Sequence, residues 1–197
     1  MKIIGLTALK GAGKDTMADF LVSNNKFVKI SFAQFMKDAS KILFDWTDEH
    51  FEHDNKEIID KYWGISPRQF LQNFGTEFLR GLSQLNSTSL CIYNSSILKG
   101  NFSFHIKRLN LHINKLYKNK INNIVITDIR FQDEFDFIKQ LGGIIVKINR
   151  DISSNEYSNH LSETFINDFK EDFIIYNNSS KEEFYKHIQE FLRLNCS

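Results

Sequence analysis

The stretch KIIGLTALKGAGKDT, residues 2–16, decides the fold class of this chain. Residues 2–8 predict a buried strand, and an apolar-periodic segment ending near Val22 predicts a helix after the glycines. Gly11 and Gly13 let the backbone turn so that successive N–H groups point inward at an anion. The positive end of the helix dipole lies at the same place. The stretch therefore predicts a phosphate-binding loop; the alternative is a glycine turn that only caps a helix.

The loop departs from the usual pattern G-x-x-x-x-G-K-[ST] at two positions. Ala8 stands where the first glycine is usual, and Asp15 stands where the hydroxyl residue is usual, with Thr16 one place later. We expect Lys14 to reach the β- and γ-phosphates and Thr16 to bind phosphate or the magnesium shell. The methyl group of Ala8 should impair the phosphate-binding loop only modestly. Because its charge repels phosphate, Asp15 should face the acceptor or bind magnesium through water. The predicted nucleotide contacts of the loop are Lys10, Gly11, Ala12, Gly13, Lys14, Asp15 and Thr16.

Strands and helices alternate along the rest of the chain, without an internal repeat or a linker. This alternation predicts one α/β domain, residues 1–197, in three layers with a mostly parallel sheet flanked by helices. Right-handed crossovers place the functional loops along one edge of the sheet, after Ala8, Phe32, Thr127 and Asn149. The other predicted strands are 27–32, 123–127, 144–149 and 173–176; the other predicted helices are 34–44, one from Pro67, 105–117, 131–141 and 181–194.

Residues 66 and 67 (Ser-Pro) predict the start of a helix. Ser66 is a typical N-cap residue, and Pro67 suits the first helical position. The acidic stretch before it, Asp45–Asp60, has apolar residues spaced through it and predicts a solvated helical face.

Composition excludes several classes of protein. The formal net charge of +1 lacks the basic excess typical of nucleic-acid binders, so we expect no nucleic-acid partner. Cys91 and Cys196 form neither a metal-ligand spacing nor a disulfide framework, which favours a reducing, cytoplasmic compartment. No apolar run approaches the ~20 residues of a membrane helix, and the lysines from Lys10 to Lys14 end the first apolar run too early for a signal peptide.

Five segments, in order along nearly the whole chain, resemble motifs of the deoxynucleoside monophosphate kinases of phages and large DNA viruses. The resemblance implies the nucleoside monophosphate kinase type of P-loop fold, ATP and Mg²⁺ as cofactors, a deoxynucleoside monophosphate as acceptor, and a possible homodimer. Phosphomevalonate kinases built on the same scaffold are also similar. Residues 81–121 match no motif. The matching segments are 1–22 with GKDT, 31–37 (SFAQFMK), 67–80 (PRQFLQNFGTEFLR), 128–134 (DIRFQDE) and 160–163 (HLSE).

Arginines near predicted loops and helix starts suit phosphoryl transfer, because a guanidinium fork matches phosphate oxygens. We expect Arg130 to clamp the acceptor phosphate; the alternative is a surface salt bridge to Asp133 or Glu134. Arg68 is the second expected phosphate ligand, with simple solvent exposure as the alternative. Arg150 should reach the ATP side.

The remaining predicted contacts lie mostly in the acceptor part, about residues 33–121, and a closing loop is expected at about 150–164. Asp128 follows a strand and is expected in the magnesium shell together with Asp15 and Thr16, unless it is only a helix cap. Phenylalanines at helical spacing are more often core than base-stacking residues. The predicted substrate contacts are Phe35, Lys37, Arg68, Gln72, Gly75, Thr76, Arg130 and Glu134.

The resulting hypothesis is transfer of the γ-phosphoryl group of ATP to a deoxynucleoside 5′-monophosphate. Lys14, Arg130 and Arg68 are the expected catalytic residues. The alternatives are a P-loop kinase for another phosphorylated small molecule, of the phosphomevalonate or dephospho-CoA type, or a nucleotide-binding module without turnover. Base preference, the choice between ribose and deoxyribose, and oligomeric state stay open at this point.

Overall fold

The computed structural model describes residues 1–52, 54–79, 103–151 and 170–195, with the side chains of residues 76 and 77 left out. The chain divides into two compact units. The first combines Met1–Ser31 with His112–Ser197, and the second is Phe32–Leu111. No helix in the described ranges is long and apolar enough to cross a membrane.

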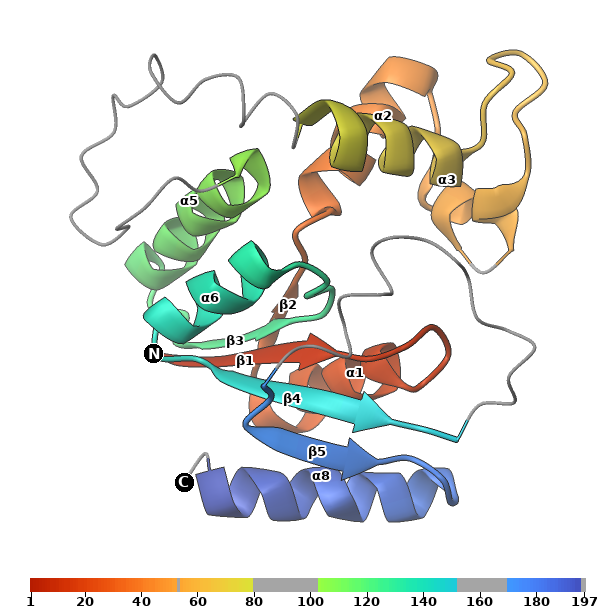
Figure 1. The fold of residues 1–197 in the computed structure, drawn as a ribbon. Helices are drawn as coiled ribbons and strands as arrows, with labels where there is room; N and C mark the ends of the chain where they lie inside the picture. The colour runs from red at the N-terminus through yellow and green to blue at the C-terminus, as the bar shows by residue number, and fades with distance from the viewer. Residues whose placement is uncertain (53, 80–102, 152–169, 196–197) are drawn as a thin grey trace. The chain divides into compact units, whose positions relative to one another are not determined.

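The first unit is built on a five-stranded, wholly parallel sheet with the order β2-β3-β1-β4-β5 (Figure 1). Central β1 is buried from Ile3 onward, as expected for a parallel strand covered on both faces. Its neighbours start the pairing at Lys2↔Asn123 and Ile4↔Ile144. The predicted parallel sheet is thus confirmed. The strands are β1 (Lys2–Thr7), β2 (Val28–Ile30), β3 (Asn123–Ile126), β4 (Ile144–Asn149) and β5 (Phe173–Tyr176).

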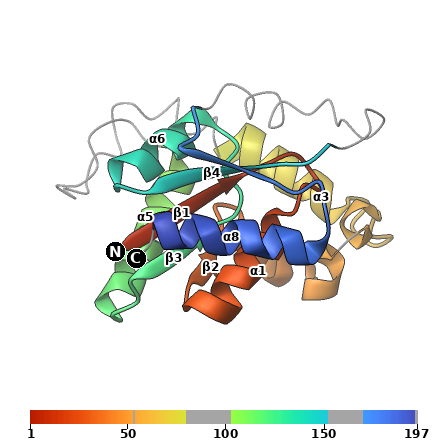
Figure 2. The ribbon, with the colours of Figure 1, turned by 90° about the horizontal axis from the view of Figure 1, so that it is seen from below.

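Helices cover both faces of this sheet. Helices α1 (Lys14–Asn25) and α8 (Lys181–Asn195) pack together on one face, where the rings of Phe20 and Tyr185 are 4.7 Å apart (Figure 2). Helix α6 (Gln132–Gln140) lies on the opposite face (Figure 1). These layers place the loop after β1 at the carboxyl edge of the sheet, next to the ends of β3 and β4.

The second unit is helical. It contains α2 (Gln34–Phe44), two short 3₁₀ helices η1 (Asp48–Phe51) and η2 (Asn55–Glu57), α3 (Pro67–Phe70) and the π-helix η3 (Leu71–Leu79). The boundary between the units falls within α5 (Phe104–Lys118).

The prediction of a solvated helical face over Asp45–Asp60 is right about solvation and wrong about the helix, since most described residues of the stretch are exposed but form no continuous α-helix. The stretch forms only η1 and η2, and Trp46 is 3% exposed. Its indole Nε1 donates to the Asp60 carboxylate at 2.9 Å. This bond, with further bonds from the Trp63 and Tyr62 backbone N–H groups, holds the pKa of Asp60 below its ordinary value. The buried Trp46 ring and its hydrogen bond to Asp60 thus anchor an otherwise mostly exposed stretch.

The predicted start of the next helix is confirmed. The Ser66 hydroxyl accepts from the Gln69 N–H at 3.2 Å, and the Gln69 side chain accepts from the Ser66 N–H at 3.0 Å. This reciprocal capping box holds Pro67 at the first position of α3.

Asp172 ties the start of β5 to the neighbouring strand and to α6. One of its oxygens accepts from the Ile145 N–H at 2.8 Å, and both contact Lys139 Nζ at 2.7 and 2.8 Å. Burial raises the pKa of Asp172, while the backbone bond from Ile145 and the pairing with Lys139 lower it by more, so the net pKa is below the ordinary value. Its charged form therefore stabilises the folded state.

Asp172→Asn should lower the free energy of unfolding at pH 7 by no more than about 1 kcal/mol, because the side chain is partly exposed. Since the pKa falls on folding, this stabilisation is present above the unfolded carboxyl pKa of about 4 and is lost as pH falls through the folded value. Urea unfolding at pH 7 and near pH 3 should show the difference shrinking, with Glu171→Gln as the neighbouring control. An equal loss at both pH values would contradict this assignment.

Candidate active site

The loop after β1 has the backbone of an anion site. Gly11 has φ 79° and Gly13 has φ 110°, both in the left-handed region that favours glycine. The Ala12 N–H bonds to the Leu9 carbonyl at 3.2 Å, which closes a tight turn. Gly13 is the N-cap residue of α1. Because glycine has no side chain, it does not occupy the helix N-terminus with a capping hydrogen bond. The arrangement fits a phosphate group held by backbone N–H groups.

Lys14 and Ala8 meet across this loop. The Lys14 Nζ donates to the Ala8 carbonyl at 3.3 Å, so the lysine side chain folds back along the loop. Ala8 is 4% exposed, and its φ lies outside the left-handed region. An alanine is therefore compatible with the position where a glycine is usual, as expected.

Asp15 forms an ion pair that sequence reasoning did not predict. Its carboxylate lies 3.0 Å from Lys29 Nζ on β2, and Lys29 contacts Asp19 at the same distance. Burial lowers the pKa of Lys29, but the hydrogen bonds and charges of the two carboxylates raise it by more, so the net pKa is above the ordinary value. Lys29 thus stays charged and offsets an anionic side chain at the start of α1. The magnesium and acceptor roles expected for Asp15 stay predictions.

The end of β4 also reaches the loop. Arg150 Nη1 lies 3.4 Å from the Gly11 carbonyl oxygen. A small pocket of about 260 Å³ adjoins this contact. It is lined by Leu9, Ala12, Lys147, Ile148, Asn149, Arg150 and Ile174. Arg150 therefore lies beside the loop, and its predicted contact with ATP stays a prediction.

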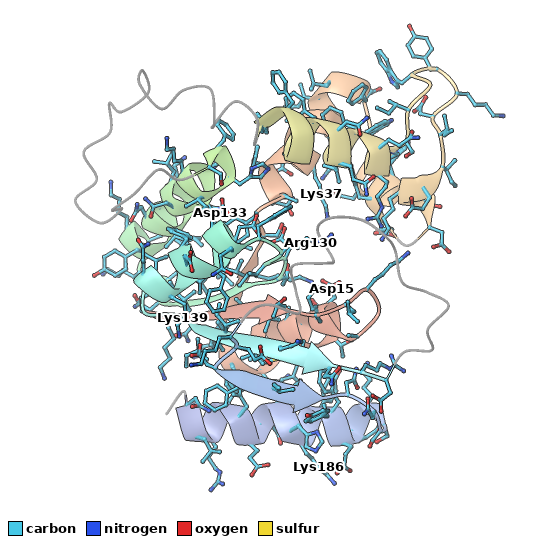
Figure 3. The ribbon with its side chains drawn as sticks, in the orientation of Figure 1. Asp15, Lys37, Arg130, Asp133, Lys139 and Lys186 are labelled. Carbon is cyan, nitrogen blue, oxygen red and sulfur yellow. The ribbon has the colours of Figure 1, made fainter. Side chains whose placement is uncertain are left out.

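Arg130 is held in place by a buried carboxylate. Glu134 is 3% exposed, and its Oε2 accepts from the backbone N–H groups of Arg130 at 2.9 Å and Phe131 at 3.2 Å. The carboxylate thereby caps the N-terminus of α6 and shapes the turn that carries Arg130. Figure 3 shows Arg130 at the start of α6, on the sheet edge from which Asp15 also projects. From the sequence we predicted a substrate contact for Glu134, and we did not predict that its carboxylate caps α6.

Asp128 and Thr16 complete the predicted residues of this sheet edge. Asp128 is half-buried just beyond β3, between two residues whose N–H groups bond to Ile30 and Leu6 carbonyls at 3.2 and 3.4 Å. Thr16 is half-buried in the first turn of α1. In the part of the chain that the structure describes, no three His, Cys, Asp or Glu side chains gather into a metal cluster. Lys10 is exposed beside the loop.

The other predicted substrate residues lie in the second unit. Lys37 is half-buried on α2. The ring of Phe35 packs 5.5 Å from Phe104 and 5.6 Å from His105. Arg68 Nε donates to Glu57 at 2.9 Å.

Three of the predicted substrate residues belong to η3, and the structure describes them to different extents. Gln72 is half-buried. A Cβ on Gly75 would lie 2.2 Å from Met36 Cε, so this glycine permits the close approach of η3 and α2. The side chain of Thr76 lies outside the described residues, as does the expected closing loop 150–164 beyond Asp151.

One contact to the loop comes from a residue that sequence reasoning did not select. The Asn177 amide, directly after β5, donates to the Ala12 carbonyl at 2.8 Å. The turn after the last strand was not among the predicted functional loops, and no local motif marks it.

Comparison with known proteins agrees with this geometry. A protein of Acanthamoeba polyphaga mimivirus assigned as a deoxynucleotide monophosphate kinase is 38% identical over 196 residues, covering 95% of this chain and 94% of that protein. The chain belongs to the deoxynucleotide monophosphate kinase family. The sequence profile of this family matches residues 96–188. The deoxynucleotide monophosphate kinase of Escherichia phage RB69 is 24% identical, covering 98% of this chain and all, 100%, of that protein.

Solved structures support the fold of this family member. A dephospho-CoA kinase from Campylobacter jejuni superposes with a TM-score of 0.52 at 16% identity, over 98% of this chain and 96% of that one. A Thermus thermophilus protein superposes with a TM-score of 0.55 at 14% identity, over 100% of this chain and 98% of that one. At such identities the likeness shows the three-layer α/β fold alone.

Glu134→Ala should lower the free energy of unfolding by about 1–2 kcal/mol, because two partly buried backbone N–H groups lose their acceptor. Glu134→Gln, which keeps an amide oxygen, should lose less. The control is Asp136→Ala on the exposed face of the same helix, where the Asp136 carboxylate accepts from the Gln132 side chain at 2.8 Å. Urea unfolding monitored by circular dichroism measures all three. A Glu134→Ala variant as stable as Asp136→Ala would contradict the capping role.

Proposed function

We propose that this protein transfers the γ-phosphoryl group of ATP to a deoxynucleoside 5′-monophosphate, giving ADP and the deoxynucleoside diphosphate. The observation that carries the proposal is the loop Ala8–Thr16, with two glycines at positive φ running into α1. It occurs in a chain that belongs to the deoxynucleotide monophosphate kinase family.

The nucleotide-binding part of the proposal rests on the first unit. The backbone N–H groups at Gly13–Thr16 and the α1 dipole favour the anionic phosphates. Lys14 bonds to the Ala8 carbonyl at 3.3 Å and has a flexible side chain, which a stronger anionic partner can draw away. Lys10 and Arg150 flank the loop and add positive charge.

The catalytic part of the proposal concerns charge. A phosphate oxygen of the monophosphate attacks the γ-phosphorus in line while the bond to the ADP oxygen breaks. That oxygen is already anionic near neutral pH, so no strong general base is required. Lys14 and Arg130 offset the repulsion between the two phosphate groups, and Arg68 is proposed to assist them. Mg²⁺, held through Thr16 and Asp128 or Asp15 with phosphate oxygens, would neutralise further charge; one or two protein ligands are usual for this ion.

Acceptor recognition is proposed for the second unit. Lys37 and Arg68 supply cationic groups, and Gln72 and Thr76 supply hydrogen-bonding groups. Phe35 offers an aromatic face for a base, although its ring already packs on Phe104 and His105. We further propose that residues 33–121 form the acceptor-binding part and that 150–164 closes over the reactants to exclude water, which otherwise competes as acceptor.

Lys14→Ala should reduce turnover by about 100-fold or more, because it removes a cation from the transferring phosphate, while the fold stays intact. The assay is ADP release from ATP and Mg²⁺ with each deoxynucleoside monophosphate in turn. Lys186→Ala, an exposed lysine on α8 (Figure 3), is the matched control and should keep wild-type activity.

The same assay distinguishes the alternatives. ADP release that depends on dephospho-CoA or phosphomevalonate, and not on any nucleotide, would redirect the assignment to another acceptor class. Nucleotide binding without release for any acceptor would indicate a binding module. Near-normal turnover of Lys14→Ala would refute the catalytic assignment of the loop.

Arg130→Ala should raise the KM for the monophosphate about 10-fold or more and leave the KM for ATP nearly unchanged, because a clamp on the acceptor phosphate is lost. Arg130→Lys should recover little, since an ammonium lacks the planar fork. The control is Arg193→Ala at an exposed position of α8. An equal rise in both KM values would place Arg130 on both substrates and contradict the specific acceptor role.

A further inference from the structure

The turn after β5 holds a side chain against the phosphate loop. Asn177 Nδ2 donates to the Ala12 carbonyl oxygen at 2.8 Å, although the two residues lie 165 positions apart in the chain. The Asn177 backbone N–H donates to the Asn149 carbonyl at 2.8 Å, which continues the pairing of β4 with β5. The amide is therefore delivered to the loop from a fixed backbone position.

The bond sets the direction of one peptide group in the loop. In a planar trans peptide, the carbonyl and the N–H of the next residue point in opposite directions. Because Asn177 binds the Ala12 carbonyl, the Gly13 N–H points away from Asn177. A carbonyl oxygen turned toward a phosphate would repel it, so this orientation leaves a donor where an anion binds.

The carbonyl of the preceding peptide group is also held by a side chain, although the N–H of that peptide is already bonded within the loop. Arg150 Nη1, at the end of β4, lies 3.4 Å from the Gly11 carbonyl, and the Ala12 N–H bonds to Leu9 at 3.2 Å. Two successive loop carbonyls are thus held by side chains from the ends of two adjacent strands. Of the two contacts, the one from Asn177 is shorter and partly buried.

The glycine of the loop is matched to the asparagine. A Cβ on Gly13 would lie 2.5 Å from Asn177 Nδ2, closer than real contacts allow, and 3.5 Å from Phe184 Cε1. Glycine at position 13 therefore satisfies two requirements: it adopts a φ of 110° without strain, and it leaves room for the Asn177 amide. A larger residue at position 13 would therefore displace the Asn177 side chain.

We infer that Asn177 is a positioning residue that preorganises the phosphate loop for the triphosphate of ATP without touching the nucleotide. The inference deepens the proposed function, since it takes ATP as the ligand of the loop. Donors held in place before binding lose no ordering entropy when the anion arrives, so a loosened loop binds ATP more weakly.

The test compares Asn177→Ala and Asn177→Asp with Asn178→Ala. The aspartate keeps the shape but replaces the donor by an oxygen that repels the Ala12 carbonyl. Asn178 lies in the same turn but pairs with Asp151, through two bonds of 2.8 Å, and does not bond to the loop. ATP binding is measured by isothermal titration calorimetry without acceptor, alongside steady-state kinetics and the melting temperature of each nucleotide-free variant.

Asn177→Ala should weaken ATP binding about 3- to 10-fold, the range expected for one net hydrogen bond. Asn177→Asp should weaken it at least as much, and Asn178→Ala should stay within about 2-fold of wild type. The KM for ATP should follow the dissociation constant, while the KM for the acceptor should not change. A purely structural role would instead lower the melting temperature and leave the ATP affinity of the folded protein unchanged.

Three outcomes overturn the inference in distinguishable ways. Wild-type protein that binds ATP, with both Asn177 variants binding it equally well, overturns the positioning role and leaves the kinase assignment standing. An equal loss in Asn178→Ala also overturns it, because the whole turn and not the amide would then be responsible. Wild-type protein that binds no ATP overturns the proposed function together with the inference.

Discussion

The positive backbone angles at Gly11 and Gly13 are the constraint on which the rest of the site depends. They are favourable because neither residue has a Cβ, and they turn the chain between β1 and the start of α1. β1 lies at the centre of a parallel sheet, so this turn emerges beside the ends of β3 and β4. The sheet order thereby brings Arg130, Asp128 and Arg150 to the same edge.

Two acidic side chains near the loop have stabilising partners. Asp15 lies in the first turn of α1, beside the proposed phosphate site, and its carboxylate is paired with Lys29 of β2 at 3.0 Å. Glu134 is almost wholly buried, yet its carboxylate faces the positive end of α6 and accepts two backbone hydrogen bonds. In both cases an acidic side chain close to the proposed anion site is stabilised by a nearby partner, which for Asp15 is a lysine that it shares with Asp19. The positive end of the α1 dipole then favours a phosphate at the loop.

Several elements could be predicted from sequence because their signals are local. The segment 144–149 forms β4 and 34–44 forms α2 within the predicted bounds, since an apolar run or a helical period needs no distant partner. The segment 45–60 is mostly exposed, as predicted, but it forms two short 3₁₀ helices instead of one helical face, and Trp46 buries its ring and bonds to Asp60. The family was also predicted from the sequence, through the resemblance of five segments, and the relative that is 38% identical confirms it.

The sequence by itself determined the alternating α/β order, the glycine turn at Gly11–Gly13, and the identity of the cationic residues available to bind phosphate. Those features depend on residue type and on neighbours a few positions away. Only the tertiary structure decided that Asn177 binds Ala12, that Lys29 pairs with Asp15, and that the Glu134 carboxylate serves the backbone instead of pointing outward. The first two contacts depend on which strand lies beside which, and the third on how deeply α6 is buried. No spacing along the chain encodes either property, because strand order and burial are set by packing of the whole unit.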